Sequence, residues 1–177
     1  PANQDVTDFR GKDRAGSYSG FVPRMDWDTT PPKLIWEQRV GPAWSSMIVV
    51  GGRLFTQEQR SEAEAVVCYD AASGQELWAQ QETARFSENV SGPGPRATPT
   101  FADGKIFAAG ATGGLCCLDA SSGKPIWSRN LASDAGVEPP QWGYSSSPLV
   151  VDDLVIAFAG GSDHGLVAHR VKDGALA

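Results

Sequence analysis

This chain of 177 residues contains an internal repeat. The segments CYDAASGQELW (68–78) and CLDASSGKPIW (117–127) match at an offset of 49 residues, with a cysteine, an aspartate, a glycine and a tryptophan in the same places. The matched positions are Asp70, Gly74 and Trp78, and Asp119, Gly123 and Trp127. A third copy, AHRVKDGALA (168–177), keeps the glycine as Gly174 but carries Arg170 instead of the aspartate. Such a period indicates stacked structural units of one kind.

A β-hairpin is predicted before each copy. The segments SMIVVGGRLF (46–55), TPTFADGKIF (98–107) and SPLVVDDLVI (147–156) share two apolar runs around a short turn. The pairs Gly51-Gly52 and Asp103-Gly104 suit a tight turn that needs positive φ, and the flanking residues suit strands. A third strand, an ASSG-type turn and a last strand follow, so each unit is predicted to hold four antiparallel strands. The repeated tryptophan is expected to pack between units, and the glycine to form the turn.

These units predict an all-β fold, a β-propeller of four-stranded antiparallel blades. The 20 glycines, the 12 prolines and the lack of a long amphipathic helix agree with that prediction. A plain β-sandwich is the alternative, but it gives no reason for the residues to recur in one register. We expect an N-terminal extension (1–30) followed by the propeller repeats (31–177). The blades are expected at about 45–78, 97–127 and 146–177, the last one incomplete.

The segment PKLIWEQ (32–38) resembles the last strand KPIWSR, without three strands before it. It is therefore predicted to be an orphan last strand. Because propellers typically have about four to eight blades, we expect these three or so to belong to a larger ring of about seven or eight. The remaining blades would come from a full-length chain or from another copy.

DASSGKPIW, DAASGQELW, the SSSPLVVDD hairpin and the opening DFRGKDRAGSYSG resemble the pyrroloquinoline-quinone-like (PQQ-like) β-propeller repeat family, from about residue 9 onwards. That family includes quinoprotein alcohol dehydrogenases, the lipoprotein scaffold of the outer-membrane assembly machinery, and many bacterial envelope proteins. Its dehydrogenases hold the quinone at the propeller axis, with calcium bound by carboxylate and amide oxygens. Its scaffold members bind protein partners on loops. The motif is specific for the repeat and does not define an activity.

Because the repeat residues are strong and no convergent catalytic set is present, we expect a non-catalytic binding or scaffold module without a cofactor, and the resemblance implies a place in the periplasm or cell envelope. A protein partner or a small ligand would bind the propeller loops. The alternative is the N-terminal part of an alcohol or sugar dehydrogenase that depends on PQQ and calcium. That enzyme would need a set of calcium-binding oxygens, a basic residue over the quinone, and a disulfide in a loop. The sequence shows no such set.

Two stretches between blades carry candidate binding residues. In SENVSGPGPRATP (87–99), Glu88 and Asn89 could supply oxygens to calcium, but the glycines and prolines favour a simple turn. The stretch is expected on one rim, with Arg96 as a candidate contact. In SDAGVEPPQWGYSSSP (133–148), Trp142 and Tyr144 could anchor a partner, although packing of Trp142 against the adjacent blade is favoured.

The adjacent Cys116 and Cys117 invite comparison with the disulfide between adjacent cysteines of quinoprotein dehydrogenases. In the repeat, however, Cys117 aligns with Cys68, and Cys116 aligns with Val67. Both are therefore predicted to be packing residues of a strand, where successive side chains point to opposite faces. Three cysteines do not settle the redox compartment.

Other patterns receive simple interpretations. His164 and His169 have no second ligand at metal spacing, so we expect a surface and an edge histidine and no zinc site. Asp163 and His164 lack the nucleophile motif of a hydrolase. The charged run EQRSEAEA (58–65) is predicted to be a solvated, lengthened hairpin loop.

The net charge of −6, with basic residues scattered singly, argues against nucleic acid as a partner. The sequence contains no run of 18 or more apolar residues, so no transmembrane segment is predicted, and the polar opening contains no apolar signal core. An extracytoplasmic location is therefore expected from the family resemblance alone.

Overall fold

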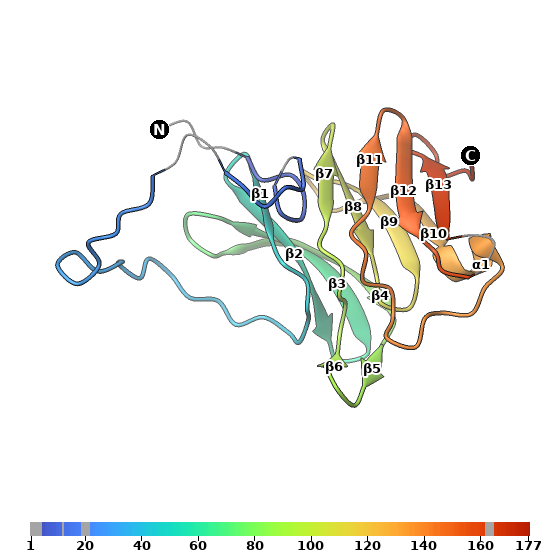
Figure 1. Cartoon of the computed structure of the whole chain (residues 1–177), viewed down its shortest axis with the longest axis horizontal. Coiled ribbons are helices and arrows are strands. Elements are labelled where there is room, and N and C mark those ends of the chain that lie inside the picture. Colours follow the sequence, from blue (N-terminus) through green and yellow to red (C-terminus); the bar gives the residue numbers. More distant parts are fainter. Residues whose placement is uncertain (1–4, 12, 19–21, 162–164) are drawn as a thin grey trace.

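The computed structural model describes residues 5–11, 13–18, 22–161 and 165–177, and three antiparallel sheets dominate it (Figure 1). Blade 1 contains β1 (Ile48–Val50), β2 (Arg53–Arg60), β3 (Ala63–Asp70) and β4 (Glu76–Thr83). Blade 2 contains β7 (Thr100–Ala102), β8 (Lys105–Ala109), β9 (Gly114–Asp119) and β10 (Pro125–Asn130). Blade 3 contains β11 (Leu149–Val151), β12 (Leu154–Phe158) and β13 (Leu166–Arg170). A small hairpin of β5 (Ser87–Glu88) and β6 (Gly92–Pro93) lies between blades 1 and 2 in the sequence.

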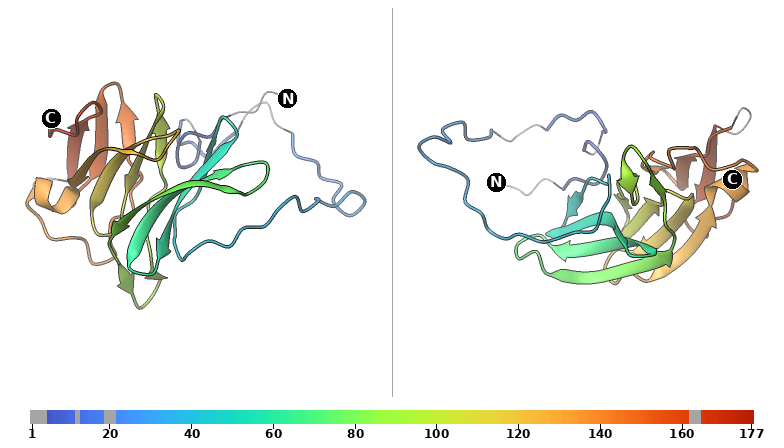
Figure 2. Two further views of the ribbon diagram at one scale, coloured as in Figure 1. Left: turned by 180° about the vertical axis from the view of Figure 1, so that it is seen from behind. Right: turned by 90° about the horizontal axis from the view of Figure 1, so that it is seen from below.

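Every blade is an antiparallel meander, with each strand paired to its neighbour in the sequence. The blades stack face to face along an arc, and the first strands β1, β7 and β11 lie next to one another (Figure 2). The prediction of an all-β fold built from four-stranded antiparallel blades is confirmed. In blade 3 an isolated antiparallel bridge joins His169 of β13 to Leu176.

The core lies between the blades. Between blades 1 and 2, Phe55 and Cys68 pack with Ile106 and Leu118. Between blades 2 and 3, the core contains the following buried residues: Phe107, Leu115, Cys117, Val155, Ala157 and Val167. Full burial of a side chain such as Phe107 contributes about 1.5–3 kcal/mol to the free energy of folding. Because these side chains are buried between blades, each blade is stabilised mainly by its neighbours.

The repeated tryptophan and glycine join each blade to the next, as the sequence predicts. The Trp78 indole N–H donates to the carbonyl oxygen of Ala120 in blade 2 at 3.2 Å, and its ring lies against Gly123. Gly123 has φ of +71° and forms the turn, and a Cβ there would lie 2.6 Å from Trp78 Cε3. Trp127 makes the same contact with Gly174 of blade 3.

Trp36 repeats this contact one step earlier in the chain. Its indole N–H donates to the Ala71 carbonyl at 3.0 Å, and a Cβ on Gly74 would lie 2.5 Å from its ring. Residues 32–38, however, form no strand, contrary to the sequence prediction. A strand needs backbone hydrogen bonds to a neighbouring strand, and among the described residues the backbone of 32–38 forms none.

The repeated aspartate holds the turn before that glycine. One carboxylate oxygen of Asp119 accepts hydrogen bonds from the backbone N–H and the hydroxyl groups of both Ser121 and Ser122. These bonds, from Ser121 first, lower the pKa of Asp119 to about 2. In the degenerate copy, Arg170 instead forms an ion pair with Asp173 at 3.0 Å.

The charged run 58–65 is not a solvated loop, and that prediction is wrong. Strands β2 and β3 continue through it to a tight turn at residues 61–62, and Glu58, Gln59 and Glu64 are buried. The strands tolerate these side chains because each of the three forms hydrogen bonds inside the molecule, although Gln59 Oε1 itself has no partner. The Glu58 carboxylate accepts from the Arg60 guanidinium at 2.6 Å and from the Gly41 N–H at 3.0 Å.

A one-turn helix, α1 (Leu131–Ala135), follows blade 2 and was not predicted. The Asn130 side chain caps its N-terminus, and Gly136 ends it with φ of +66°. Against this helix lies His169, which is expected from the sequence to be an edge histidine. It stands on the edge strand β13 but is fully buried. In the described ranges, no helix is long and apolar enough to cross a membrane.

Candidate binding surface at the inter-blade rim

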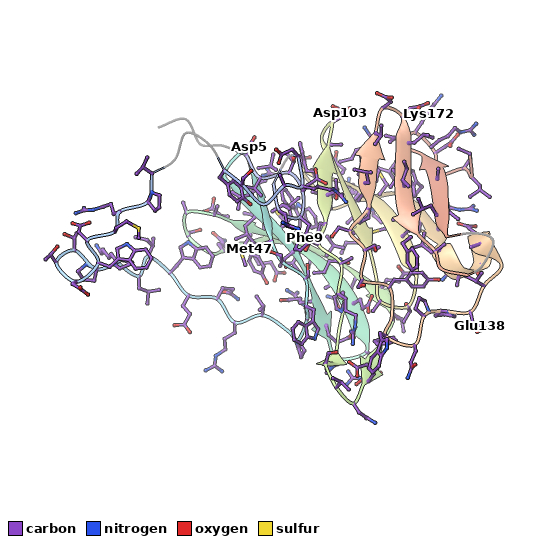
Figure 3. All side chains as sticks on the ribbon, in the orientation of Figure 1. Asp5, Phe9, Met47, Asp103, Glu138 and Lys172 are labelled. Carbon is purple, nitrogen blue, oxygen red and sulfur yellow. The ribbon has the colours of Figure 1, made fainter. Side chains whose placement is uncertain are left out.

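All connections between blades emerge at one end of the molecule, because four antiparallel strands return the chain to the end where the blade began. The hairpin turns at Asp103 and after β13 at Lys172 lie at the opposite end from Glu138, which belongs to the connection between blades 2 and 3 (Figure 3). We call the surface formed by residues 41–47, 84–98 and 131–147 the rim.

Every connection of the rim exposes at least one large apolar side chain, and the first also exposes Met47, at 54%. Trp44 is 63% exposed, Val90 is 80% exposed, and Trp142 is 53% exposed. Trp44 is also fixed in place, since its indole N–H donates to the Ser91 carbonyl at 2.9 Å and its backbone N–H donates to the Pro95 carbonyl. Packing of Trp142, favoured from sequence, is not observed, and the ring faces solvent.

A pocket of about 370 Å³ opens beside the first strands of the blades. Its lining residues are Phe9, Arg14, Trp44, Arg96, Thr98, Ser145, Ser146 and Ser147. Arg14 forms an ion pair with Asp8 at 2.8 Å and donates to the Ser147 carbonyl at 3.3 Å. The pocket therefore combines hydroxyl groups and aromatic rings with two guanidinium groups, those of Arg14 and Arg96, which both pair with carboxylates.

Arg96, a candidate contact from sequence, is almost wholly engaged inside the molecule. Its side chain is 7% exposed, forms an ion pair with Glu88 at 3.2 Å, and donates to the carbonyl oxygens of Gly92 and Gly94. Its guanidinium carbon lies 4.4 Å from the centre of the Phe86 ring. Arg96 therefore fixes the β5–β6 hairpin against the blades.

Glu88 caps the turn of that hairpin. Its carboxylate accepts hydrogen bonds from the N–H groups of Val90 and Ser91 as well as from Arg96. A hydrogen bond with the Ser91 side chain, followed by the two backbone bonds and the charge of Arg96, lowers the pKa of Glu88 and outweighs the opposite effect of burial. Asn89 at the tip of the turn is exposed. The turn interpretation therefore accounts for Glu88, while Asn89 remains accessible on the rim.

Tyr144 is not a surface residue, and the prediction that it contributes to rim binding is wrong. Its side chain is 2% exposed, and its hydroxyl donates to the Ala159 carbonyl at 3.1 Å. The ring also packs on Gly113, where a Cβ would lie 2.8 Å away. The sequence does not distinguish the two aromatic residues of this loop. Trp142 and Tyr144 are only two residues apart, yet the first is exposed and the second is buried.

Cys116 and Cys117 lie in regular positions of strand β9, opposite Ser128 and Trp127 of β10. Their predicted place in a repeat strand is confirmed. Burial raises the pKa of Cys68 to about 11 and that of Cys116 and Cys117 to about 12. At neutral pH these thiols are therefore poor nucleophiles.

In the described part of the chain, no three His, Cys, Asp or Glu side chains gather closely enough to hold a metal ion. Asp163 and His164 lie outside the described residues. His169 Nε2 instead lies 2.9 Å from the Asp134 carboxylate of α1, and Asp134 also accepts from Arg129 at 3.1 Å. Sequence reasoning missed this cluster, although the Asn130 and Gly136 capping residues could have indicated the helix that positions Asp134.

Four-stranded antiparallel blades, fanned along an arc and joined by tryptophan–glycine contacts, define a β-propeller repeat protein. A family model of PQQ-like repeats, described as outer membrane protein assembly factor BamB, matches residues 13–85 and 62–177. The chain therefore belongs to this PQQ-like repeat family.

Curated relatives fall into two functional classes. The chain is 33% identical over 104 residues to quinohemoprotein alcohol dehydrogenase ADH IIB of Pseudomonas putida, which covers 57% of this chain and 14% of the relative. It is 29% identical over 157 residues to outer membrane protein assembly factor BamB of Shewanella oneidensis, which covers 83% of this chain and 36% of the relative. The chain thus spans well under half the length of either protein.

Solved structures support the fold. A europium-containing methanol dehydrogenase matches with a TM-score of 0.58 and 19% identity, over 81% of this chain and 26% of that one. The quinohemoprotein alcohol dehydrogenase of Comamonas testosteroni matches with a TM-score of 0.56 and 18% identity, over 77% of this chain and 20% of that one.

Proposed function

We propose that this chain is part of a non-catalytic PQQ-like propeller protein that binds a partner protein in the bacterial cell envelope. The observation that carries the proposal is the rim, where Trp44, Val90 and Trp142 are exposed on three successive connections. Exposed tryptophans on a rigid scaffold are typical anchors of a protein interface, because each can bury a large apolar area at low entropic cost. The likeness to BamB, an assembly factor, agrees with an extracytoplasmic scaffold role.

A second candidate is a quinone-dependent dehydrogenase, favoured by the identity to quinohemoprotein alcohol dehydrogenase and by the pocket beside the first strands. An anionic quinone would supply the redox chemistry and would need free cationic donors. Arg14 and Arg96 are the cationic residues of the pocket, but they pair with Asp8 and Glu88 respectively. The described residues therefore fit this group poorly, and we derive no catalytic step from them.

Calorimetric titration of the full-length protein with PQQ, with and without calcium, separates the two candidates. We expect no binding heat in either condition. Calcium-dependent binding at micromolar affinity or tighter, about 8 kcal/mol or more, would instead establish the dehydrogenase reading.

Site-specific cross-linking tests the rim. A photoreactive amino acid at position 44 or 142 should cross-link to one envelope protein in intact cells. The same amino acid at position 27 is the matched control, since Trp27 is 57% exposed but lies in the segment that projects away from the blades (Figure 1). Equal cross-linking from positions 27 and 142 would contradict a specific rim interface.

A further inference from the structure

An N-terminal segment lies across the first strands of all three blades. We call residues 5–11, 13 and 14 the strap. Val6 forms an antiparallel bridge with Val49 of β1, with N–H to carbonyl distances of 2.7 and 3.0 Å in the two directions. The Thr7 carbonyl accepts from the Phe101 N–H of β7 at 2.8 Å. The strap thus behaves as an additional strand at the edge of blade 1 and continues onto blade 2.

Side chains extend the contact to blade 3. Asp8 accepts from the hydroxyl of the buried Thr100 at 3.2 Å and pairs with Arg14. Arg14 in turn donates to the carbonyl oxygens of Ser147 and Pro148, immediately before β11. The single hydroxyl proton of Thr100 can instead be donated to the Pro148 carbonyl at 2.6 Å, so the strap closes a polar network between blades 2 and 3.

The surface beneath the strap is the inner edge, which comprises the edges of β1 and β7 away from β2 and β8, together with the carbonyls of Ser147 and Pro148. An uncovered strand edge presents unpaired N–H and carbonyl groups and readily pairs with another strand. Recognition of this kind draws affinity from main-chain hydrogen bonds and specificity from side chains such as the Asp8 and Arg14 pair. The inner edge therefore has the chemistry of a peptide-binding surface.

The strap is also held lightly. Asp5, Phe9 and Arg10 are exposed, and the bonds from backbone to backbone between strap and blades are those of Val6 and Thr7, beside one bond from the Gly51 N–H to the Asp5 carboxylate. In the described ranges, residues 17–47 form no helix or strand, and they extend far from the sheets before returning to β1 (Figure 1). Segments with few buried contacts open locally at low free-energy cost, and a long connection allows exchange between copies.

We propose that the inner edge is a binding site for one extended strand and that the strap is its exchangeable occupant, which the same segment of a second copy can replace. The second copy is the occupant that fits, because its Val6, Asp8 and Arg14 offer the groups that the inner edge already binds. In one molecule the connection keeps the strap at an effective concentration of about 1 mM. A free copy of the segment at micromolar concentration is therefore excluded until the strap is weakened.

The test uses a fluorescent peptide of residues 5–16, DVTDFRGKDRAG, and the full chain. Fluorescence anisotropy measures its binding to the unmodified protein and to a Val6→Pro, Arg14→Ala variant, which removes the Val6 N–H donor and the guanidinium. We expect at least a tenfold lower Kd for the variant. A Val22→Pro, Arg24→Ala variant makes the same substitutions in the exposed connection and should behave like the unmodified protein. A scrambled peptide should not bind.

A variant that retains the circular dichroism of the unmodified protein but binds the peptide no better would overturn the proposal. Hydrogen exchange of the unmodified chain tests it without any substitution. The Val49 and Phe101 amides should exchange at least tenfold faster than the Cys68 amide at the centre of blade 1, and protection equal to that of Cys68 would also overturn it. Two differently labelled copies, mixed at high concentration, should develop energy transfer that excess unlabelled peptide abolishes. These results do not depend on a rim partner, so this proposal and the proposed function can fail separately.

Discussion

Gly123 shows how one residue can serve two purposes. Its positive φ forms the turn that Asp119 caps, and its missing side chain leaves room for the Trp78 indole. Gly74 and Gly174 meet Trp36 and Trp127 in the same way. The repeated glycine and tryptophan therefore form one contact between two blades. Substitution of either residue should lower the stability of both blades.

Substitution Gly123→Ala separates backbone strain from steric conflict. Gly104 is the matched control, since its φ of +73° is nearly the same and no atom lies within 4 Å of an added Cβ. We expect Gly104→Ala to cost about 1–2 kcal/mol of unfolding free energy through strain. Gly123→Ala should cost about 1–3 kcal/mol more, because its Cβ collides with Trp78. Urea denaturation measures both, and equal costs would contradict the packing role of Gly123.

Glu64 is a buried carboxyl group in the interface of blades 1 and 2. Both carboxylate oxygens accept from the Ala111 N–H, at 3.1 and 3.3 Å, and the side chain lines a pocket of about 60 Å³. Burial raises the pKa of Glu64 to about 7, the Ala111 bond lowers it, nearby Glu82 raises it, and Arg96 lowers it. The folded protein therefore holds this proton more tightly than the unfolded chain does.

The raised pKa of Glu64 predicts a pH-dependent stability. Below about pH 4.5 Glu64 is protonated in both the folded and the unfolded state, and its contribution to the free energy of unfolding is fully present. As the pH rises to about 7, the unfolded state loses the proton first, so the free energy of unfolding falls by roughly 3 kcal/mol. Relative to the unmodified protein, Glu64→Gln should therefore gain stability across this range. Thermal denaturation at pH 5 and 8 tests this, with the exposed Glu62→Gln as control. A pH-independent difference would refute it.

At the scale of elements, α1 connects blades 2 and 3 through Asp134. This carboxylate accepts from Arg129 of β10 and lies 2.9 Å from His169 Nε2 of β13. Burial raises the pKa of Asp134, but the hydrogen bonds from Arg129 and His169 outweigh that effect and hold it below its ordinary value. The helix is also held by its Leu131 N–H, which donates to the Gly113 carbonyl at 2.8 Å, and by Leu131 and Ala135, which are buried in the core between blades 2 and 3.

Substitution Asp134→Asn should reduce the free energy of unfolding by about 1–3 kcal/mol, because it leaves the buried His169 without a charged partner. Glu62→Gln removes an exposed ion pair with Arg85 at 3.6 Å and should change stability by less than about 0.5 kcal/mol. Guanidinium denaturation of both variants measures the difference. A loss for Asp134→Asn no larger than that for Glu62→Gln would show that the cluster does not join the blades.

The sequence pattern predicts the repeat elements well. Hairpin turns with positive φ at Gly51-Gly52 and Asp103-Gly104, and the packing of Trp78 and Trp127, are all found. These features depend on short-range geometry that every copy repeats. The buried run 58–65 and the burial of Tyr144 depend on partners distant in the sequence, such as Gly41 and Ala159, which no local pattern reveals. The strap escapes prediction for the same reason.

At the scale of the whole molecule, the three cysteines report on the integrity of the blade interfaces. Cys68 and Cys117 are fully buried in strands of different blades, and Cys116 is half-buried beside Cys117. With pKa values of about 11 to 12, all three thiols are protonated at neutral pH. Their reactivity should therefore follow the separation of the blades.

In the folded, reduced protein at pH 7.5, Ellman's reagent should modify none of the three thiols within an hour, whereas 8 M urea should expose all three at once. The slow reaction follows from burial and from the small thiolate fraction. The amount of thionitrobenzoate released gives the number of thiols that have reacted. Rapid reaction of the reduced native protein would show that the interfaces open readily. Recovery of a single thiol in urea without a reductant would show that two cysteines are joined in a disulfide.

The tryptophan–glycine contact gives the stack a direction. Each tryptophan belongs to one blade, while the carbonyl and the glycine that contact it belong to the next. The last strand of each blade is therefore held in place by the turn of the following blade. Damage to the turn of blade 2 should therefore loosen β4 of blade 1 before it loosens its own outer strand. Hydrogen exchange along the chain would show the weakness displaced by one blade toward the N-terminus, and mutational effects in such a stack should be assigned to the neighbour that loses its support.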